Sequence, residues 1–426
     1  MKSHISYNQI LNALFFMILV FQDAGTFSFL PLNLFQILEL IMFFIICTTQ
    51  KKLKLNRIFL LLFFYITLVT ICQPFDIESI KTLAFLFISL TTIYLYLQMT
   101  DIQTVANIIY SAAVLLSLYG IAQELAYILN IPEIYDISRY GFALNGTYSA
   151  TSGLMRAMSL YAEPSHTSSI LGLGFLIGLI GKNGTIENVR LWKSIVILIF
   201  AVLTQSTIVY ITILMAVICF VFIYQERLSN KVKGFVLALL VFVVLLITQQ
   251  ELIANVIGRL SQFETLQTDT GNDLSALAIV TNLDIALEKM KDGYLFGTGI
   301  DSHRLYYDKY IGQLYTNLYM YLNSSDCASM YIRIFSEFGI IGIIGFVGAL
   351  INKVAKGVKN ANKTVLISAA MFSVAIMRDG NYMRCLSQVL FIMIFFKKYK
   401  SNHTINHLQH MRTKHYDLIE ANNKEN

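Results

Sequence analysis

Three side chains that can carry acid–base or anion chemistry fall within eleven residues, where a polar segment meets a long apolar one. They are Arg156, Glu163 and His166. Pro164 suits the first turn of a helix because its φ is fixed, so we expect Glu163 beside the positive N-terminal end of a helix over residues 165–181. These groups predict a site for an anionic or hydroxyl-bearing ligand. The alternative is a capped helix whose arginine reaches the lipid headgroups.

A second polar segment, residues 251–326, carries a similar concentration of functional groups. Gly297 and Gly299 form a Gly-x-Gly sequence, and Asp301, His303 and Arg304 follow it. The glycines indicate either a simple turn or backbone amides brought close to an anion. Earlier in the segment, apolar residues at helical spacing predict an amphipathic helix along the membrane surface, namely Leu277, Val280, Leu283, Leu287 and Met290.

The composition is that of a polytopic membrane protein. Of the 426 residues, 56% are hydrophobic and only 14% are charged, and the mean hydropathy is +0.61. The net charge of +6 comes from basic residues between apolar runs and does not indicate nucleic acid. The five scattered cysteines have neither metal-ligand spacing nor a disulfide pattern. No nucleotide-binding or HExxH motif occurs, so we expect no cofactor and no metal.

The apolar runs predict an all-α protein with about twelve transmembrane helices in a single domain over residues 1–396. The first run lacks a small-residue cleavage site and is interpreted as a retained span. Lys and Arg concentrate in alternate connections, except near Asp101, which predicts that both termini are cytoplasmic. The long segments 130–163 and 251–326 then lie outside, and 397–426 is a cytoplasmic polar tail. The predicted spans are 8–22, 26–48, 58–72, 80–98, 104–128, 165–181, 193–204, 207–225, 233–250, 327–351, 363–377 and 383–396.

Three short motifs, in order, resemble bacterial polysaccharide repeat-unit polymerases of the Wzy type, within the O-antigen ligase and polymerase superfamily. The first is Arg156 followed by Glu163-Pro164-Ser165. The second is Phe296-Gly297-Thr298-Gly299, and the third is Ser336-Glu337-Phe338-Gly339-Ile340-Ile341-Gly342. Thr204-Gln205-Ser206 loosely matches a polar turn of the same family. The resemblance covers about residues 150–350 and implies a GT-C-like membrane fold with two long extracytoplasmic loops.

One departure from the superfamily bears on the reaction. Ligases usually place a His-Asn pair nine residues before the Glu of the third motif, and here those positions hold Ala328 and Ser329. The missing histidine argues against a ligase and favours a polymerase. It leaves open which residue of the second outer segment, if any, acts as a base.

The resemblance implies that the substrates are undecaprenyl-pyrophosphate-linked oligosaccharides on the outer face of the plasma (inner) membrane. A hydroxyl of one repeat unit attacks the anomeric carbon of another chain, and lipid pyrophosphate leaves. The product is a capsule, an O-antigen or another exopolysaccharide. A flippase and a chain-length regulator are the protein partners that such a polymerase implies.

The roles that the resemblance suggests are phosphate binding and proton transfer. Arginines suit the phosphates because their fork pairs two oxygens, and we expect Arg156 first, then Arg304, with Arg378 and Arg384 across the last outer turn. Gly297 and Gly299 belong to the same substrate-binding set. The candidates for the base are, in order, Glu163, His166, Asp326 and His303.

A transporter or flippase of lipid-linked sugars is the alternative from another class. Twelve spans with both ends inside suit a transporter, and Glu124, Arg333 and Glu337 lie in or near spans, where charges are usually functional. Arg333 and Glu337 are four residues apart and can pair on one helix face. The absence of repeat symmetry and the two long outer segments argue against transport.

Overall fold

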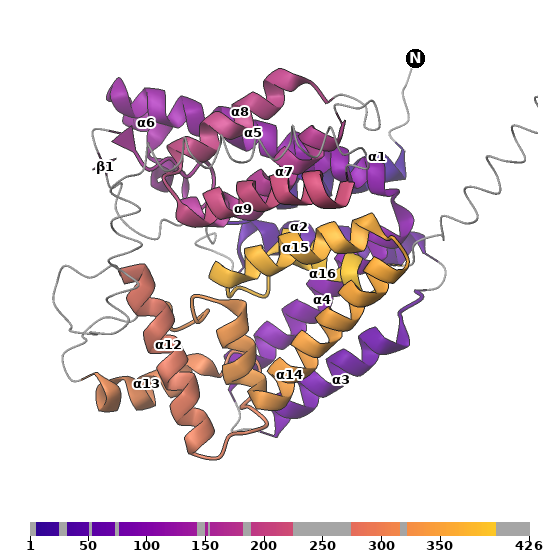
Figure 1. Cartoon of the computed structure of the whole chain (residues 1–426), viewed down its shortest axis with the longest axis vertical. Coiled ribbons are helices and arrows are strands. Elements are labelled where there is room, and N and C mark those ends of the chain that lie inside the picture. The colour runs from indigo at the N-terminus through magenta and orange to yellow at the C-terminus, as the bar shows by residue number, and fades with distance from the viewer. Residues whose placement is uncertain are drawn as a thin grey trace, which may run out of the picture.

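The computed structural model describes residues 6–24, 32–50, 53–72, 76–142, 150–151, 154–181, 189–224, 274–315 and 322–397. They form a bundle of helices with one two-residue hairpin, which confirms the all-α prediction (Figure 1). The main helices are α1 (Tyr7–Val20), α2 (Leu34–Thr49), α3 (Arg57–Ile71), α4 (Ile77–Met99), α5 (Ile102–Ile128), α7 (Ser168–Gly181), α8 (Leu191–Leu203), α9 (Thr207–Ile218), α12 (Leu274–Lys291), α13 (His303–Leu314), α14 (Met330–Lys359), α15 (Lys363–Arg378) and α16 (Cys385–Phe395).

The minor elements lie mostly between α5 and α7. They are α6 (Pro132–Tyr135), η1 (Ile137–Tyr140), η2 (Pro164–Thr167), the π-helical η3 (Cys219–Tyr224), and the antiparallel pair β1 (Ala150–Thr151) and β2 (Leu154–Met155). The predicted helix at 165–181 therefore starts as the 3₁₀ turn η2 and becomes α-helical at Ser168.

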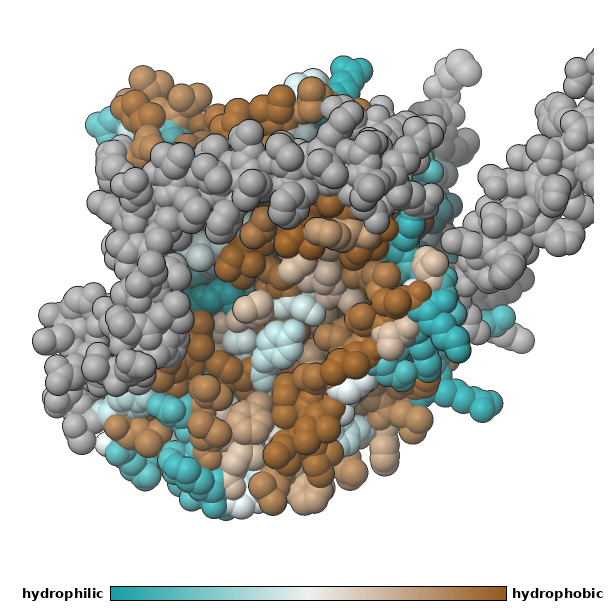
Figure 2. Space-filling view, viewed as in Figure 1, coloured by the Kyte–Doolittle hydropathy of each residue, from teal (hydrophilic) through white to brown (hydrophobic). Residues whose placement is uncertain are grey.

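Five of the described helices are long and apolar enough to cross a membrane, namely 77–99, 102–128, 164–181, 207–224 and 330–359. The other predicted spans coincide with shorter helices, except 233–250, which lies outside the described residues. Hydrophobic side chains cover much of the face around α14. Hydrophilic ones gather over α12 and α13 and at the C-terminal end of α14 (Figure 2). This pattern suits a multi-pass membrane protein.

The connections meet in two groups at opposite ends of the bundle. At the basic end, Lys353 donates to the carbonyl of Phe395 and Lys397 to the carbonyl of Leu97, each at 2.9 Å. At the cavity end, Ala24 forms a β-bridge with Phe142, Arg384 pairs with Asp23, and Arg304 pairs with Asp76. This grouping agrees with the alternation of the predicted topology. Which end faces the cytoplasm stays a prediction.

A break in α14 docks the second polar segment onto the bundle. Gly339 has φ 68° and ψ −168°, so the helical hydrogen bonds are interrupted there. The carbonyl of Glu337 instead accepts from the amides of Thr298 and Gly299, each at 2.9 Å. A Cβ on Gly297 would lie 2.2 Å from the oxygen of Glu337, so only glycine permits this approach.

A buried hydrogen-bond network ties α2, α4 and α16 together beneath the cavity end. The hydroxyl of Ser89 lies 2.8 Å from Oε1 of Glu39 and 2.7 Å from Oε1 of Gln388. The amide nitrogen of Gln388 donates to the carbonyl of Tyr382 at 2.9 Å, which fixes the amide orientation. Ser89 has one proton for two oxygens, so the network closes when Glu39 is the neutral acid and donates to Ser89. It thereby supports the turn that carries Tyr382.

Candidate active site

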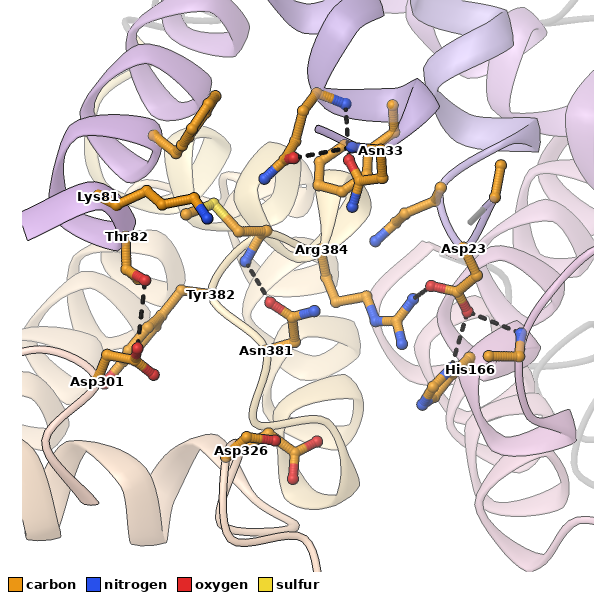
Figure 3. A pocket seen from close by; sticks show the side chains of 18 of the residues that line it. Asp23, Asn33, Lys81, Thr82, His166, Asp301, Asp326, Asn381, Tyr382 and Arg384 are labelled. Atoms are coloured by element: carbon orange, nitrogen blue, oxygen red, sulfur yellow. Dashed lines mark hydrogen bonds and ion pairs between the residues drawn. The ribbon is translucent and has the colours of Figure 1, made fainter. Parts of the chain in front are cut away.

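A polar cavity of about 770 Å³ opens at the cavity end of the bundle. Its walls come from parts of the chain that are far apart in sequence, and Figure 3 shows their side chains pointing toward one space. The charged and polar side chains among them include Asp23, Asn33, Glu78, Lys81, Thr82, His166, Asp301, Asp326, Arg333, Asn381, Tyr382 and Arg384.

The cavity cluster, Asp23, His166 and Arg384, joins the first connection to the start of α7 and the turn before α16. Nδ1 of His166 lies 2.8 Å from Oδ2 of Asp23, and Arg384 pairs with the other carboxylate oxygen. The amide of Ala162 donates to Asp23 at 3.0 Å. Burial alone would raise the pKa of Asp23, but Arg384 and His166 outweigh it and hold that pKa well below its usual range. Asp23 is therefore a carboxylate.

This geometry determines which nitrogen of His166 is available. Because ionised Asp23 only accepts, the neutral imidazole carries its proton on Nδ1 and keeps a lone pair on Nε2. Nε2 lies 3.9 Å from Oε2 of Glu163, beyond hydrogen-bond distance, and it has no hydrogen-bond partner among the described residues. A carboxylate-oriented imidazole with a free nitrogen at a cavity wall can accept a proton from a hydroxyl.

Glu163 occupies the position before η2, but its side chain does not cap the helix. It accepts from the hydroxyl of Ser165 at 2.9 Å instead. Glu163 thus lies beside the N-terminal end of the helix, as expected, but the capping role of the alternative interpretation is not seen. Glu163 is not among the residues that line the cavity, and it lies beside His166.

Arg156 does not pair with Glu163 in the structure. Arg156 follows β2 at the turn between α8 and α9, where the amide of Ala157 donates to the carbonyl of Leu203 at 3.2 Å. Its Nε is buried without a hydrogen-bond partner, and within the described residues it forms no ion pair with Glu163. Arg156 does not line the cavity. The expected three-residue cluster is thus reduced to Glu163 and His166.

The other predicted arginines occupy three different environments. Arg384 is buried in the cavity wall, and its Nε lies 2.8 Å from Asp379. Arg304 lies at the edge of the cavity, and Arg378 donates to the carbonyl of Ala328 at 3.4 Å. Of these three, only Arg384 lines the cavity.

The Gly-x-Gly sequence serves as a turn. The amide of Gly299 donates to the carbonyl of Glu337, and that of Gly297 donates to Tyr294 at 3.0 Å. Both amides are already hydrogen-bonded, so the expectation that they approach an anion is corrected: the glycines instead allow close contact with α14.

His303 belongs to a sealed cluster with Lys289 and Ser336, all fully buried. Nε2 of His303 donates to Oδ1 of Asn282 at 2.8 Å, and Nδ1 accepts from the hydroxyl of Ser336 at 2.7 Å. Lys289 donates to that hydroxyl at 2.9 Å and to Thr298 at 2.8 Å. Burial and then the charge of Lys289 place the pKa of His303 well below its usual value. With both nitrogens bonded and no exposure, His303 is not a base for a substrate, which corrects that expectation.

Asp326 does line the cavity, together with residues that the sequence analysis left out of the site. These are Asp23, Lys81, Asp301 and Tyr382. Asp23 and Lys81 share one sequence signal: each is a charge at the end of an apolar run, on the side away from the lysine-rich connections. That signal marks them as unusual but does not bring them together.

The cations of the cavity differ in how far carboxylates already neutralise them. Arg333 lies 3.0 Å from Glu337 and 3.1 Å from Asp301, and Arg384 pairs with Asp23 and Asp379. Lys81 has one carboxylate, Glu78, at 3.4 Å, and its side chain is 44% exposed. Lys81 is therefore the cation of the cavity wall with most donor capacity left for a ligand.

Within the described residues, no group of three or more His, Cys, Asp or Glu side chains is arranged to hold a metal ion.

An apolar helix bundle that opens at one end into a polar cavity defines a multi-pass membrane protein with a candidate catalytic site. Residues 193–347 match the family model described as O-Antigen ligase. This match supports the O-antigen ligase and polymerase superfamily, and it does not separate the two activities. No curated protein matches the chain. The matched stretch includes the turn at 297–299 and the broken helix α14 that receives it.

Proposed function

We propose that this protein polymerises lipid-linked oligosaccharide repeat units into a surface polysaccharide on the outer face of the plasma membrane. The donor is a repeat unit on undecaprenyl pyrophosphate. The observation that carries the proposal is the pairing of Asp23 with His166 in the wall of a polar cavity of about 770 Å³. The match of residues 193–347 to the O-Antigen ligase family model supports a reaction on glycans. A flippase would supply the donor, and a chain-length regulator would act on the product.

The reaction requires a proton acceptor at the attacking hydroxyl. The hydroxyl oxygen of one repeat unit forms a bond to the anomeric carbon of the other chain. The bond from that carbon to the pyrophosphate oxygen breaks, and lipid pyrophosphate leaves with the electron pair. The hydroxyl proton passes to Nε2 of His166. Asp23 holds the required tautomer and stabilises the imidazolium that forms, with Glu163 nearby.

The leaving group develops negative charge, which a cation in the cavity stabilises. Arg333 and Arg384 are largely compensated by their own carboxylates, whereas Lys81 has a single exposed partner. We therefore assign the pyrophosphate contact in the cavity to Lys81 first. Arg304, at the edge of the cavity, is the second cation. It too pairs with two carboxylates, Asp76 and Asp301, but its side chain is 32% exposed, against 6% for Arg333 and 7% for Arg384.

Polymerase and ligase differ in the acceptor, and two observations bear on the choice. At the position of the ligase histidine, Ala328 is buried with φ 55°, and its amide donates to Asp326 at 3.1 Å. Its methyl group offers no acid–base chemistry, which favours the polymerase. The description of the matching family favours a ligase as the second candidate.

The deciding experiment supplies purified lipid-linked repeat units to the purified protein, and also compares glycan lengths in a deletion strain. A polymerase gives a ladder of lipid-linked products in vitro, and its deletion leaves single repeat units on the cell. A ligase gives no ladder, and its deletion leaves long chains on the lipid carrier. Repeat units trapped on the inner leaflet would instead indicate a flippase and overturn the proposal.

A further inference from the structure

A second, mainly apolar cavity of about 390 Å³ lies between α3, α4 and α13, close to the first. Ile71, Ile80, Leu83 and Leu305 supply its apolar wall. Ile71, Ile80 and Leu305 also expose 69%, 42% and 44% of their surface. Since α3 and α4 are apolar helices of the bundle, these side chains place the groove at the lipid-facing side of the protein.

The helix α4 separates the two cavities. Glu78, Lys81 and Thr82 line the polar cavity and, at spacings of three and four, share one face of the helix. Ser79, Ile80 and Leu83 line the apolar groove from the other side. A ligand that occupies both cavities must therefore cross the N-terminal end of α4.

Arg304 lies at that crossing. It pairs with Asp76, which lines the apolar groove, and its Nε is 3.4 Å from Asp301, which lines the polar cavity. These contacts use Nε and Nη2, and Nη1 has no partner among the described residues. The side chain is 32% exposed. A guanidinium held on two sides, with a third nitrogen free, is suited to a phosphate oxygen.

We propose that the groove between α3, α4 and α13 binds the first part of the polyprenyl chain of the lipid-linked substrate. One phosphate of the pyrophosphate then lies beside Arg304, the other reaches Lys81 at the cavity wall, and the sugar occupies the polar cavity. This inference rests on the proposed function. Along the path the surroundings change from apolar, through the Arg304 guanidinium and its two carboxylates, to polar. The substrate has the same sequence of parts: a hydrocarbon chain, two phosphates and an oligosaccharide. Asp76 and Asp301 hold the guanidinium in place between the two cavities.

The test compares two donors that differ only in the lipid, one with the full polyprenyl chain and one with two isoprene units. Leu83→Trp fills the groove from α4, and Leu305→Trp fills it from α13. The control is Phe64→Trp on α3, a side chain that is 66% exposed and does not line the groove. We expect both groove variants to lower the preference for the long donor by about tenfold, since the added ring displaces several buried methylene groups. The control variant should keep the wild-type preference for the long donor. All three variants should use the short donor at close to the wild-type rate.

The outcomes separate the two proposals. If the wild-type protein transfers neither donor, the proposed function fails. If it transfers both and the preference for the long donor survives in both groove variants, the groove assignment is overturned. A polyprenyl pyrophosphate with a photoreactive group on its second isoprene unit tests binding without turnover. Label on α3, α4 or α13 that unlabelled polyprenyl pyrophosphate displaces supports the groove, and label only elsewhere overturns it.

Discussion

The cavity cluster and the sealed cluster contain similar groups in different surroundings. Each has a histidine, a cation and a further hydrogen-bonding side chain. In the sealed cluster both nitrogens of His303 are bonded and the side chain is fully buried. In the cavity cluster, Nδ1 of His166 is bonded to Asp23, and Nε2 is free of hydrogen bonds among the described residues.

The difference shows that residue type and proximity to a motif do not identify a catalytic histidine. His303 lies four residues after the Gly-x-Gly turn, and His166 lies two residues after Glu163-Pro164. A base needs a free lone pair and a path for the substrate, and of these two histidines only His166 has both. The sealed cluster instead fixes the loop at 297–303 to α14. Substitutions at the cavity and in the sealed cluster test this division between a chemical and a structural role.

The largest expected effect is on transfer in the cavity cluster. His166→Ala should lower the rate of repeat-unit transfer by about 10²–10⁴-fold, the usual contribution of a positioned general base. The measurement is product formation from purified lipid-linked donor, with thermal unfolding in detergent as the control for folding. Transfer at the wild-type rate would assign the base elsewhere, and Glu163→Gln and Asp326→Asn would then be assayed in turn.

The second effect concerns the cation of the cavity wall. Lys81→Ala should lower kcat/KM by about 10²-fold, because a charge on the leaving pyrophosphate is no longer stabilised. Lys81→Arg should retain most of the activity. The matched control is Lys291→Ala, which also removes a lysine from an exposed pair with a glutamate three residues earlier. Equal activities of the Lys81→Ala and Lys291→Ala variants would remove Lys81 from the site.

In the sealed cluster the expected effect is on stability. His303→Ala leaves the hydroxyl proton of Ser336 without its acceptor and the amide oxygen of Asn282 without its donor, which should lower the free energy of unfolding by about 3 kcal/mol. Transfer per folded molecule should stay close to wild type. A variant as stable as wild type but inactive would reverse the division drawn here and make His303 catalytic.

The smallest expected effect is a pH dependence of the free energy of unfolding, which comes from Lys289. Burial lowers the pKa of Lys289 to about 8, while the unfolded chain keeps a pKa near 10.5. Between these values the unfolded state binds more protons than the folded state, so stability rises with pH by about 1 kcal/mol per pH unit. Thermal unfolding of the wild type and of Lys289→Met from pH 8 to 10 measures this change in stability. Stability should rise with pH in the wild type and not in the variant. An equal rise in both proteins would contradict the assignment to Lys289.

Much of the framework was predictable from local sequence. The apolar runs predicted helices that the structure contains at α1–α5, α7–α9 and α14–α16, and the periodicity over 277–290 predicted α12. Hydrophobic runs and helical periodicity predict helices because each helix forms its backbone hydrogen bonds internally and must bury its own apolar face. The three motifs likewise located two of the contacts between segments, at Gly297 and at Gly339.

The sequence by itself determined the helices and made His166 and Glu163 neighbours, because these features depend on residues close together in the chain. Only the tertiary structure decided the composition of the site. It brought Asp23 to His166 across 143 positions and Arg384 to Asp23 across 361. It also placed Arg156 at another turn and enclosed His303. Such outcomes depend on how helices pack and which way side chains point, and in a bundle those are set by contacts between distant segments.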